Sequence, residues 1–217
     1  NGTAYASFTF QVQDDGGTAS GGVDLDQSPN TITFNVTAVN DAPSFTKGPN
    51  QTVLEDAGAQ TVNNWATSIS AGPADEAGQA LDFIVTNDNN GLFSTQPAVS
   101  ASGTLTYTPA ANANGSVTVT VKIHDNGGTA NSGVDTSAPQ TFTIAVTPVN
   151  DAPAGADKTI TMLEDNTYTL AVVDFGFSDP LDNPANALLA VKITALPADG
   201  SLKDNGVAVT AGQFIPV

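Results

Sequence analysis

The chain of 217 residues contains no cysteine and no arginine. Without cysteine it can form no disulfide, no thiolate metal site and no cysteine nucleophile. Its five basic residues are all lysines, and 22 acidic residues give a formal net charge of −17. An acidic surface disfavours nucleic acids and anionic membranes as partners and favours cations.

Long apolar runs are also missing. No segment approaches the ~20 consecutive apolar residues of a membrane-spanning helix, and no signal peptide is recognisable, so an exported protein would contain this chain as an internal piece. Apolar and polar residues instead alternate with a period of two along 8–12, 32–36, 117–124 and 142–147. Successive side chains of a strand point to opposite faces, and turn-forming Gly, Asn, Asp and Pro separate the runs. The pattern predicts an all-β sandwich.

The sequence repeats itself at an interval of about 110 residues. VNDAP occurs at 39–43 and again at 149–153, while DDGGTASGGVD at 14–24 matches DNGGTANSGVD at 125–135. VLED at 53–56 likewise matches MLED at 162–165. This order predicts a C-terminal half-repeat at 1–43, a complete repeat at 44–150 and an N-terminal half-repeat at 151–217. One period suits an immunoglobulin-like sandwich of ~100 residues.

These motifs together resemble the cadherin-like and bacterial immunoglobulin-like tandem repeats of large bacterial surface adhesins, a resemblance that covers nearly the whole chain. VNDAP is similar to the Asn-Asp-Pro linker of cadherins, and LTYTPAANANG at 105–115 and VKIHDNGGT at 121–129 fit the wider pattern. The resemblance implies tandem Greek-key β-sandwiches on the bacterial cell surface or otherwise extracellular, in a stalk that serves cell adhesion. The chain departs from cadherins in lacking a second linker Asn and an acid-rich motif in mid-domain.

In cadherins, Ca²⁺ at each junction is bound by a Glu of one domain, by the linker and by an acidic loop of the next domain. The resemblance therefore implies two sets of calcium ligands here: Glu55, Asn150, Asp151, Asp179 and Asp182 after the central repeat, and Asn40, Asp41 and Asp75 or Glu76 before it. Calcium prefers six to eight oxygen ligands, which such side chains supply. The implied function is mechanical, because a bound cation would stiffen the hinge between neighbouring repeats.

Other interpretations compete with this one. Asp and Asn are also preferred turn residues, the two DxGGT motifs are interpreted as two-residue hairpin turns, and His124 is expected to be solvated. Trp65 and Tyr107 motivate an alternative function as a carbohydrate- or protein-binding module without junction calcium, although a single Trp is more often a core residue. A carboxylate pair such as Asp179 and Asp182 could serve a glycosidase. No complete site is assembled, however, so we expect no enzyme.

The half-repeats predict a further kind of partner besides neighbouring repeats and an unidentified surface ligand. Two complementary half-sandwiches leave open sheet edges and half-filled cores. The C-terminal half of one molecule could complete the N-terminal half of the next, as in strand complementation. Contacts of this head-to-tail type do not close and produce chains of molecules.

Overall fold

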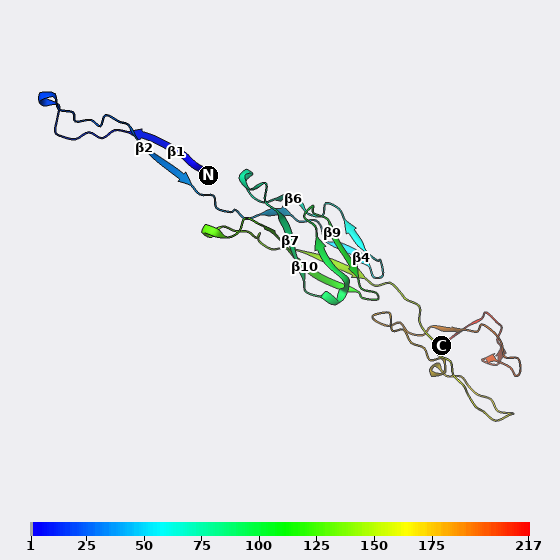
Figure 1. The fold of residues 1–217 in the computed structure, drawn as a ribbon. Coiled ribbons are helices and arrows are strands. Elements are labelled where there is room, and N and C mark those ends of the chain that lie inside the picture. Colours follow the sequence, from blue (N-terminus) through cyan, green and yellow to red (C-terminus); the bar gives the residue numbers. More distant parts are fainter. Residues whose placement is uncertain (1) are drawn as a thin grey trace.

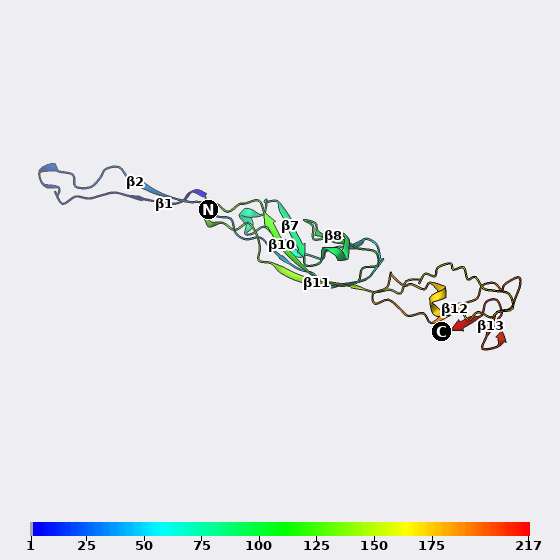
Figure 2. The ribbon, with the colours of Figure 1, turned by 90° about the horizontal axis from the view of Figure 1, so that it is seen from below.

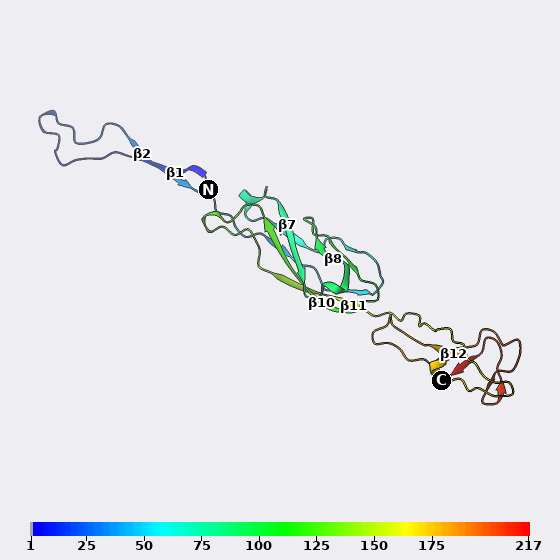
Figure 3. The same ribbon diagram turned by 60° about the horizontal axis from the view of Figure 1, so that its bottom comes forward.

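The computed structural model describes residues 2–217, so residue 1 of the predicted first segment lies outside the described residues. Every regular element in this range is a β-strand or a short 3-10 helix. Three parts follow one another along an elongated molecule: a projecting hairpin, a central sandwich and a C-terminal segment of short strands (Figure 1). The hairpin and the C-terminal segment lie at opposite ends of the sandwich in all three views (Figures 2 and 3).

The N-terminal part is an antiparallel pair of strands, β1 (Gly2–Phe10) and β2 (Asn30–Val36). The chain between them contains the 3-10 helix η1 (Ala19–Gly21). This pair forms a two-stranded sheet of its own, with no third strand on either edge among residues 2–217.

The central part is built from two layers. Its elements are β3 (Ser44–Thr46), β4 (Gln51–Leu54), β5 (Gln60–Val62), β6 (Thr67–Ser70), η2 (Ala74–Glu76), β7 (Leu81–Asn87), η3 (Asn90–Leu92), β8 (Phe93–Val99), β9 (Leu105–Pro109), β10 (Gly115–Asp125), η4 (Ala130–Ser132) and β11 (Gln140–Thr147). One layer is a four-stranded sheet in the order β4-β11-β10-β7, in which only β4 is parallel to its neighbour. The sheets β5-β9-β8 and β3-β6 supply the other layer.

The core lies between these layers and follows from the alternation in the sequence. Along β10, Val117, Val119, Val121 and Ile123 are at most 1% exposed, while the residues between them reach the polar side. Trp65 packs on Phe142 with 4.4 Å between ring centroids. Burying one side chain of the size of Val or Ile contributes about 1.5–3 kcal/mol. Because these residues form one hydrophobic cluster, their burial stabilises the central sandwich.

The C-terminal part has much shorter elements. They are η5 (Val172–Phe175), β12 (Ala190–Lys192), β13 (Lys203–Asp204), β14 (Val207–Ala208) and β15 (Phe214–Pro216). The four strands form two small antiparallel pairs, β12 with β15 and β13 with β14.

The side chain of Asp174 connects several residues of this part. It accepts hydrogen bonds from the backbone N–H of Ala171 at 2.8 Å and from the hydroxyl of Tyr168 at 3.0 Å, and it forms an ion pair with Lys158.

The all-β prediction is confirmed, whereas the prediction of two-residue hairpin turns at the two DxGGT motifs is wrong. Residues 11–29 separate the end of β1 from the start of β2, and residues 126–139 separate the end of β10 from the start of β11. Asp125 does begin a turn there, since its Oδ1 accepts the backbone N–H of Gly127 at 2.9 Å. The boundaries between the predicted repeats stay predictions. No helix within residues 2–217 is both long enough and apolar enough to cross a membrane.

Candidate metal sites at the two junctions

The junction after the central sandwich begins at a fixed glutamate. Glu55 is 2% exposed, and its Oε1 accepts the backbone N–H of Val149 at 2.7 Å while its Oε2 accepts Asn114 Nδ2 at 3.2 Å. The next residue, Asp56, turns the chain with a positive φ of 60° and accepts the N–H of Asn112 at 3.0 Å. The LED motif therefore attaches the first residue of VNDAP to the end of the sandwich.

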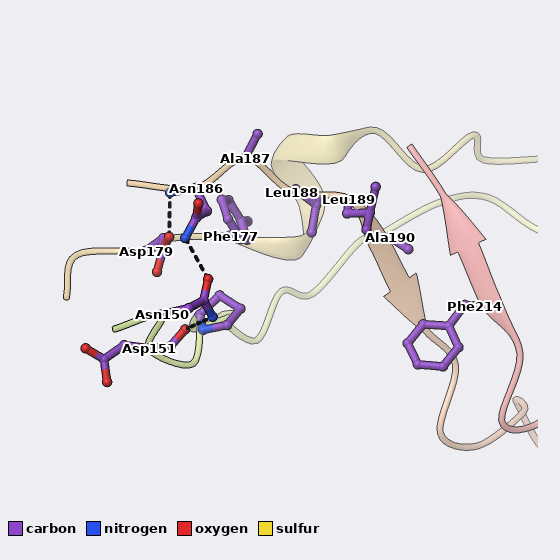
Figure 4. A pocket seen from close by; sticks show the side chains of 11 residues that line it. Asn150, Asp151, Phe177, Asp179, Asn186, Ala187, Leu188, Leu189, Ala190 and Phe214 are labelled. Atoms are coloured by element: carbon purple, nitrogen blue, oxygen red, sulfur yellow. Dashed lines mark hydrogen bonds between the residues drawn. The ribbon is translucent and has the colours of Figure 1, made fainter. Parts of the chain in front are cut away.

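Beyond this point the linker meets an acidic loop, residues 179–186. Figure 4 shows Asn186 between Asp179 and Asn150. The backbone N–H of Asn186 donates to Asp179 Oδ2 at 2.6 Å, and its Nδ2 donates to Asn150 Oδ1 at 2.9 Å and to Asp182 Oδ2 at 3.0 Å. The N–H of Asp151 lies 3.2 and 3.3 Å from the two oxygens of Asp182. Hydrogen bonds from these amide groups therefore join the linker to the loop, and the carboxylates lie next to the amides.

Two carboxylate oxygens of this cluster are buried without any hydrogen-bond donor among residues 2–217: Asp151 Oδ2 and Asp179 Oδ1. Asp179 itself is only 6% exposed. Burial raises the pKa of Asp151 above its ordinary value, and repulsion from nearby carboxylates raises that pKa further. The repelling groups are Asp56, Asp182, Glu55 and Asp179, in that order of effect. The same linker and loop border a cavity of about 340 Å³ that continues toward Leu188 and Phe214.

The junction before the sandwich repeats this arrangement with other residues. The linker asparagine, Asn40, accepts a hydrogen bond at Oδ1 from Gln79 Nε2 at 2.7 Å, as Asn150 does from Asn186. The N–H of the linker aspartate, Asp41, donates to Glu76 Oε1 at 2.9 Å, as that of Asp151 does to Asp182. The two VNDAP motifs therefore form the same pair of contacts.

Asp125, which the sequence predicts only as a turn residue, also contacts the linker. It is fully buried, and its Oδ1 accepts Asn40 Nδ2 at 2.9 Å as well as the turn N–H. Three polar atoms near this contact, Glu76 Oε2, Gln79 Oε1 and Asp125 Oδ2, are buried without a donor or acceptor in the described chain. The sequence signal for this contact with the linker was the Asp at the start of both DxGGT motifs.

The predicted ligands are only partly brought together. Glu55, Asn150, Asp151, Asp179 and Asp182 surround one junction, and Asn40, Asp41 and Glu76 meet at the other. Asp75 is exposed on η2, so the buried member of that pair is Glu76. In residues 2–217, no three or more Asp, Glu, His or Cys side chains converge closely enough to hold a metal ion as they stand.

The residues that motivated a sugar-binding alternative lie in the core. Trp65 is 2% and Tyr107 is 3% exposed, so neither presents a ring face to a ligand. The Nε1 of Trp65 donates to the carbonyl of Pro49 at 3.0 Å. His124 is half-buried rather than simply solvated, and its Nδ1 lies 2.8 Å from Asp82 Oδ1. That hydrogen bond is the main reason why the pKa of His124 is raised.

Comparison with known proteins finds a family that matches the central part. Residues 40–146 match the family model described as bacterial Ig domain. No curated protein matches the chain. The chain therefore contains a bacterial immunoglobulin-like repeat, a kind of domain that is typically a structural module and is commonly found at the cell surface or outside the cell.

Proposed function

We propose that the chain is a section of an extracellular adhesin stalk in which calcium stiffens the junctions between immunoglobulin-like repeats. The observation that carries the proposal is the set of buried carboxylate oxygens without donors at both junctions: Glu76 Oε2, Asp125 Oδ2, Asp151 Oδ2 and Asp179 Oδ1. A buried charge without a partner costs several kcal/mol. A divalent cation is the partner that would remove this cost.

The donor set fits calcium in particular. Every candidate ligand offers oxygen, the element that calcium prefers, from carboxylates and side-chain amides. With no cysteine in the chain and a single histidine, the softer ligands that select zinc or copper are scarce. The candidate ligands are Asn40, Asp41, Glu76 and Asp125 before the sandwich, and Glu55, Asp56, Asn150, Asp151, Asp179 and Asp182 after it.

The second junction explains how binding would become stiffness. Glu55 and Asp56 belong to the sandwich, Asn150 and Asp151 to the linker, and Asp179 and Asp182 to the following loop. Without a cation, the carboxylates of these three segments repel one another, and this repulsion adds to the effect of burial in raising the pKa of Asp151. When bound, calcium supplies the opposite charge that holds all three segments together. Bending at the linker would then require ligands to leave the ion.

A charge-neutral substitution at Asp179 tests this proposal. Asp179→Asn can keep the hydrogen bond from the N–H of Asn186 through its carbonyl oxygen, while its NH₂ group replaces the oxygen that lacks a donor. We expect calcium affinity at this junction to fall about tenfold or more, equivalent to ~1.4 kcal/mol. Without calcium, the variant should be at least as stable as the parent, because a buried charge has been removed.

Calorimetric titration with calcium measures the affinity, and small-angle scattering with calcium or with chelator measures the stiffness. Asp199→Asn is the matched control, since it removes one negative charge from an exposed loop. Calcium should extend the parent and the control, and should extend Asp179→Asn less. Scattering curves and melting temperatures of the parent that are identical in calcium and in chelator would reject the proposal.

A further inference from the structure

The linker asparagine Asn40 is held by the central sandwich through its backbone carbonyl and through both ends of its side-chain amide. The carbonyl accepts the N–H of Val134 at 2.9 Å, and Nδ2 donates to the carbonyl of Val134 at 2.8 Å and to Asp125 Oδ1 at 2.9 Å. Oδ1 accepts Gln79 Nε2 at 2.7 Å. These four hydrogen bonds reach two different parts of the sandwich, the loop before β7 and the loop that begins at the end of β10.

Two glycines of the segment DNGGTANSG, residues 125–133, leave the space that Asn40 occupies. A Cβ on Gly127 would lie 1.8 Å from Asn40 Oδ1, and a Cβ on Gly133 would lie 3.0 Å from Asn40 Cβ. A separation of 1.8 Å is far below any real contact of a Cβ atom. The glycine at position 127 is therefore required by the linker that lies against it, and not only by the turn.

The residues after Asn40 continue the attachment to the same sandwich. The N–H of Asp41 donates to Glu76 Oε1 at 2.9 Å. Pro43 is buried, and β3 begins at the next residue, Ser44. From Asn40 onward, the linker thus packs as an additional segment of the sandwich, although it precedes the first strand.

The second linker is held in the same way by the part of the chain that follows it. Figure 4 shows Asn150 beside Asn186, whose Nδ2 donates to Asn150 Oδ1 at 2.9 Å. Further along the linker, Ala154 and Ser178 exchange two backbone hydrogen bonds at 2.8 and 2.9 Å. The attachment of the linker to the following part therefore begins at its asparagine in both junctions.

The residue before this asparagine belongs to the preceding sandwich. The N–H of Val149 donates to Glu55 Oε1 at 2.7 Å, while the side chain of the next residue, Asn150, accepts its hydrogen bond from the following loop. Two adjacent residues of VNDAP are thus attached to different structural units.

We infer that the linker from its asparagine onward is a fixed part of the repeat that follows it, with or without metal, and that each junction bends only at the step from Val to Asn. The structural unit then begins at Asn40 rather than at residue 44. The hydrogen bonds that carry this inference need no cation, because all their donors and acceptors belong to the chain.

The inference deepens the proposed function, because it assigns the place where calcium acts. Glu55 and Asp56 lie before the step from Val149 to Asn150, and Asp151 lies beyond it. A cation bound by carboxylates from both sides would fix this single step, since the rest of the linker is already attached. Only this assignment rests on the proposed function; the attachment of the linker does not.

Distances between paired spin labels test the inference in a chain that has no cysteine of its own. Ala42→Cys with Ser102→Cys places both labels on exposed positions of the proposed unit. Thr33→Cys with Ser102→Cys places the labels on opposite sides of the first Val–Asn step, again on exposed positions. In chelator, the first pair should give a narrow distance distribution and the second pair a broad one. Calcium should narrow the second distribution and leave the first unchanged.

Hydrogen exchange measures the attachment at single amides. The N–H groups of Asp41 and Val134 donate to Glu76 and Asn40, so they should exchange equally slowly in calcium and in chelator. Gly127→Ala forces a Cβ against Asn40 Oδ1, and Asn40→Ala removes the side-chain amide without adding bulk. Either substitution should accelerate the exchange of both amides at least about tenfold in chelator, because hydrogen bonds that oppose local opening are lost.

Gly78→Ala is the matched control. Gly78 is exposed and adjacent to Gln79, and a Cβ there meets no atom within 4 Å, so this variant should exchange as the parent does. The amides of Val119 and Val121, in the buried part of β10, should exchange alike in all these proteins. Their rates separate release of the linker from unfolding of the sandwich.

Three outcomes would overturn the inference. They are a broad distribution for the Ala42 and Ser102 pair in chelator, fast exchange at Asp41 and Val134 whenever calcium is removed, and exchange in Gly127→Ala that matches the Gly78→Ala control. The first two would leave the calcium proposal intact. A narrow first distribution together with a second that ignores calcium would support the attachment and reject the calcium proposal, so the two failures are distinguishable.

Discussion

The hairpins β10–β11 and β1–β2 share their strand pairs near the loop but have very different surroundings. Ala6–Phe34, Phe8–Ile32 and Phe10–Asn30 correspond to Val117–Ile144, Val119–Phe142 and Val121–Gln140, whereas the register of β1–β2 shifts between Gly2 and Ala6. Ile144 on β11 is fully buried, and Phe34 at the equivalent place on β2 is 51% exposed. Strand register is therefore a property of the two-stranded unit itself, set by its alternation and its loop. Burial is a property of the half-repeat that packs against it. The comparison therefore distinguishes two contributions: the hairpin determines its strand register, and the half-repeat that packs against it buries its apolar face.

Truncation at the equivalent core positions should show the largest difference between the hairpins. Ile144→Ala leaves a cavity in the sandwich and should lower its free energy of unfolding by about 2–5 kcal/mol. Phe34→Ala removes atoms that are half exposed and should change it by less than about 0.5 kcal/mol. Denaturant titration followed by the fluorescence of Trp65, which packs on Phe142, reports on the central sandwich.

The measurement is made on dilute protein, so that association between molecules does not add to the effect of Phe34→Ala. Equal losses from the two substitutions would show that the N-terminal hairpin is part of the same cooperative unit as the sandwich.

The two DxGGT motifs should differ by a smaller amount. Asp125 is buried and accepts hydrogen bonds from Gly127 and Asn40, whereas Asp14 is exposed and accepts the equivalent turn bond from Gly16. Removing the charged acceptor of buried donors costs about 1.5–3 kcal/mol. We therefore expect Asp125→Ala to destabilise the sandwich by that amount, and Asp14→Ala to have an effect within about 0.5 kcal/mol.

Thermal unfolding in chelator checks this pair without a contribution from metal. Asn40→Ala removes the other partner of Asp125 and, combined with Asp125→Ala, should cost less than the sum of the two single substitutions. Strict additivity would mean that the bond between Asn40 and Asp125 does not contribute to stability.

The strands of both hairpins could be predicted from sequence because alternation is local and the repeat supplied two copies of it. The expected dry face of β1–β2 is nevertheless exposed, since burial depends on residues outside the hairpin. The loop after Asp125 was missed for a related reason. Its conformation is held by Asn40, which comes from the linker 85 residues earlier in the chain. A local pattern of Gly and Asp gives no information about a partner so distant in the sequence.

The junction residues show the same limit. The family resemblance indicated Glu55, Asp151 and Asp179 as candidate ligands, and that role stays a prediction. The motifs alone could not indicate that Glu76 rather than Asp75 is buried beside Asp41. The amides that join linker and loop, Gln79 and Asn186, belong to no recognisable motif. They become visible only when the acidic loop is folded against VNDAP.

The smallest expected difference concerns the position that is His124 in the sandwich and Gln13 in the hairpin. Both side chains lie beside an aspartate, because Gln13 Nε2 donates to Asp24 at 2.8 Å and His124 Nε2 lies 3.8 Å from Asp135. Hydrogen bonding to Asp82, together with the charges of Asp82, Asp135 and Asp125, raises the pKa of His124 above 6.5, against a smaller opposing effect of desolvation. A raised pKa means that the folded state binds the proton more tightly than the unfolded state does.

This stabilisation is therefore fully present below pH ~6.5 and is lost as the pH rises through the raised pKa of His124. His124→Gln puts the residue of the hairpin into the sandwich, so it should remove this pH dependence while leaving stability above that pKa nearly unchanged. Melting temperatures measured in chelator between about pH 5 and pH 9 span the titration. If the parent and the variant respond to pH alike, the ion pair between His124 and Asp82 contributes nothing to folding, and the two hairpins are equivalent at this position.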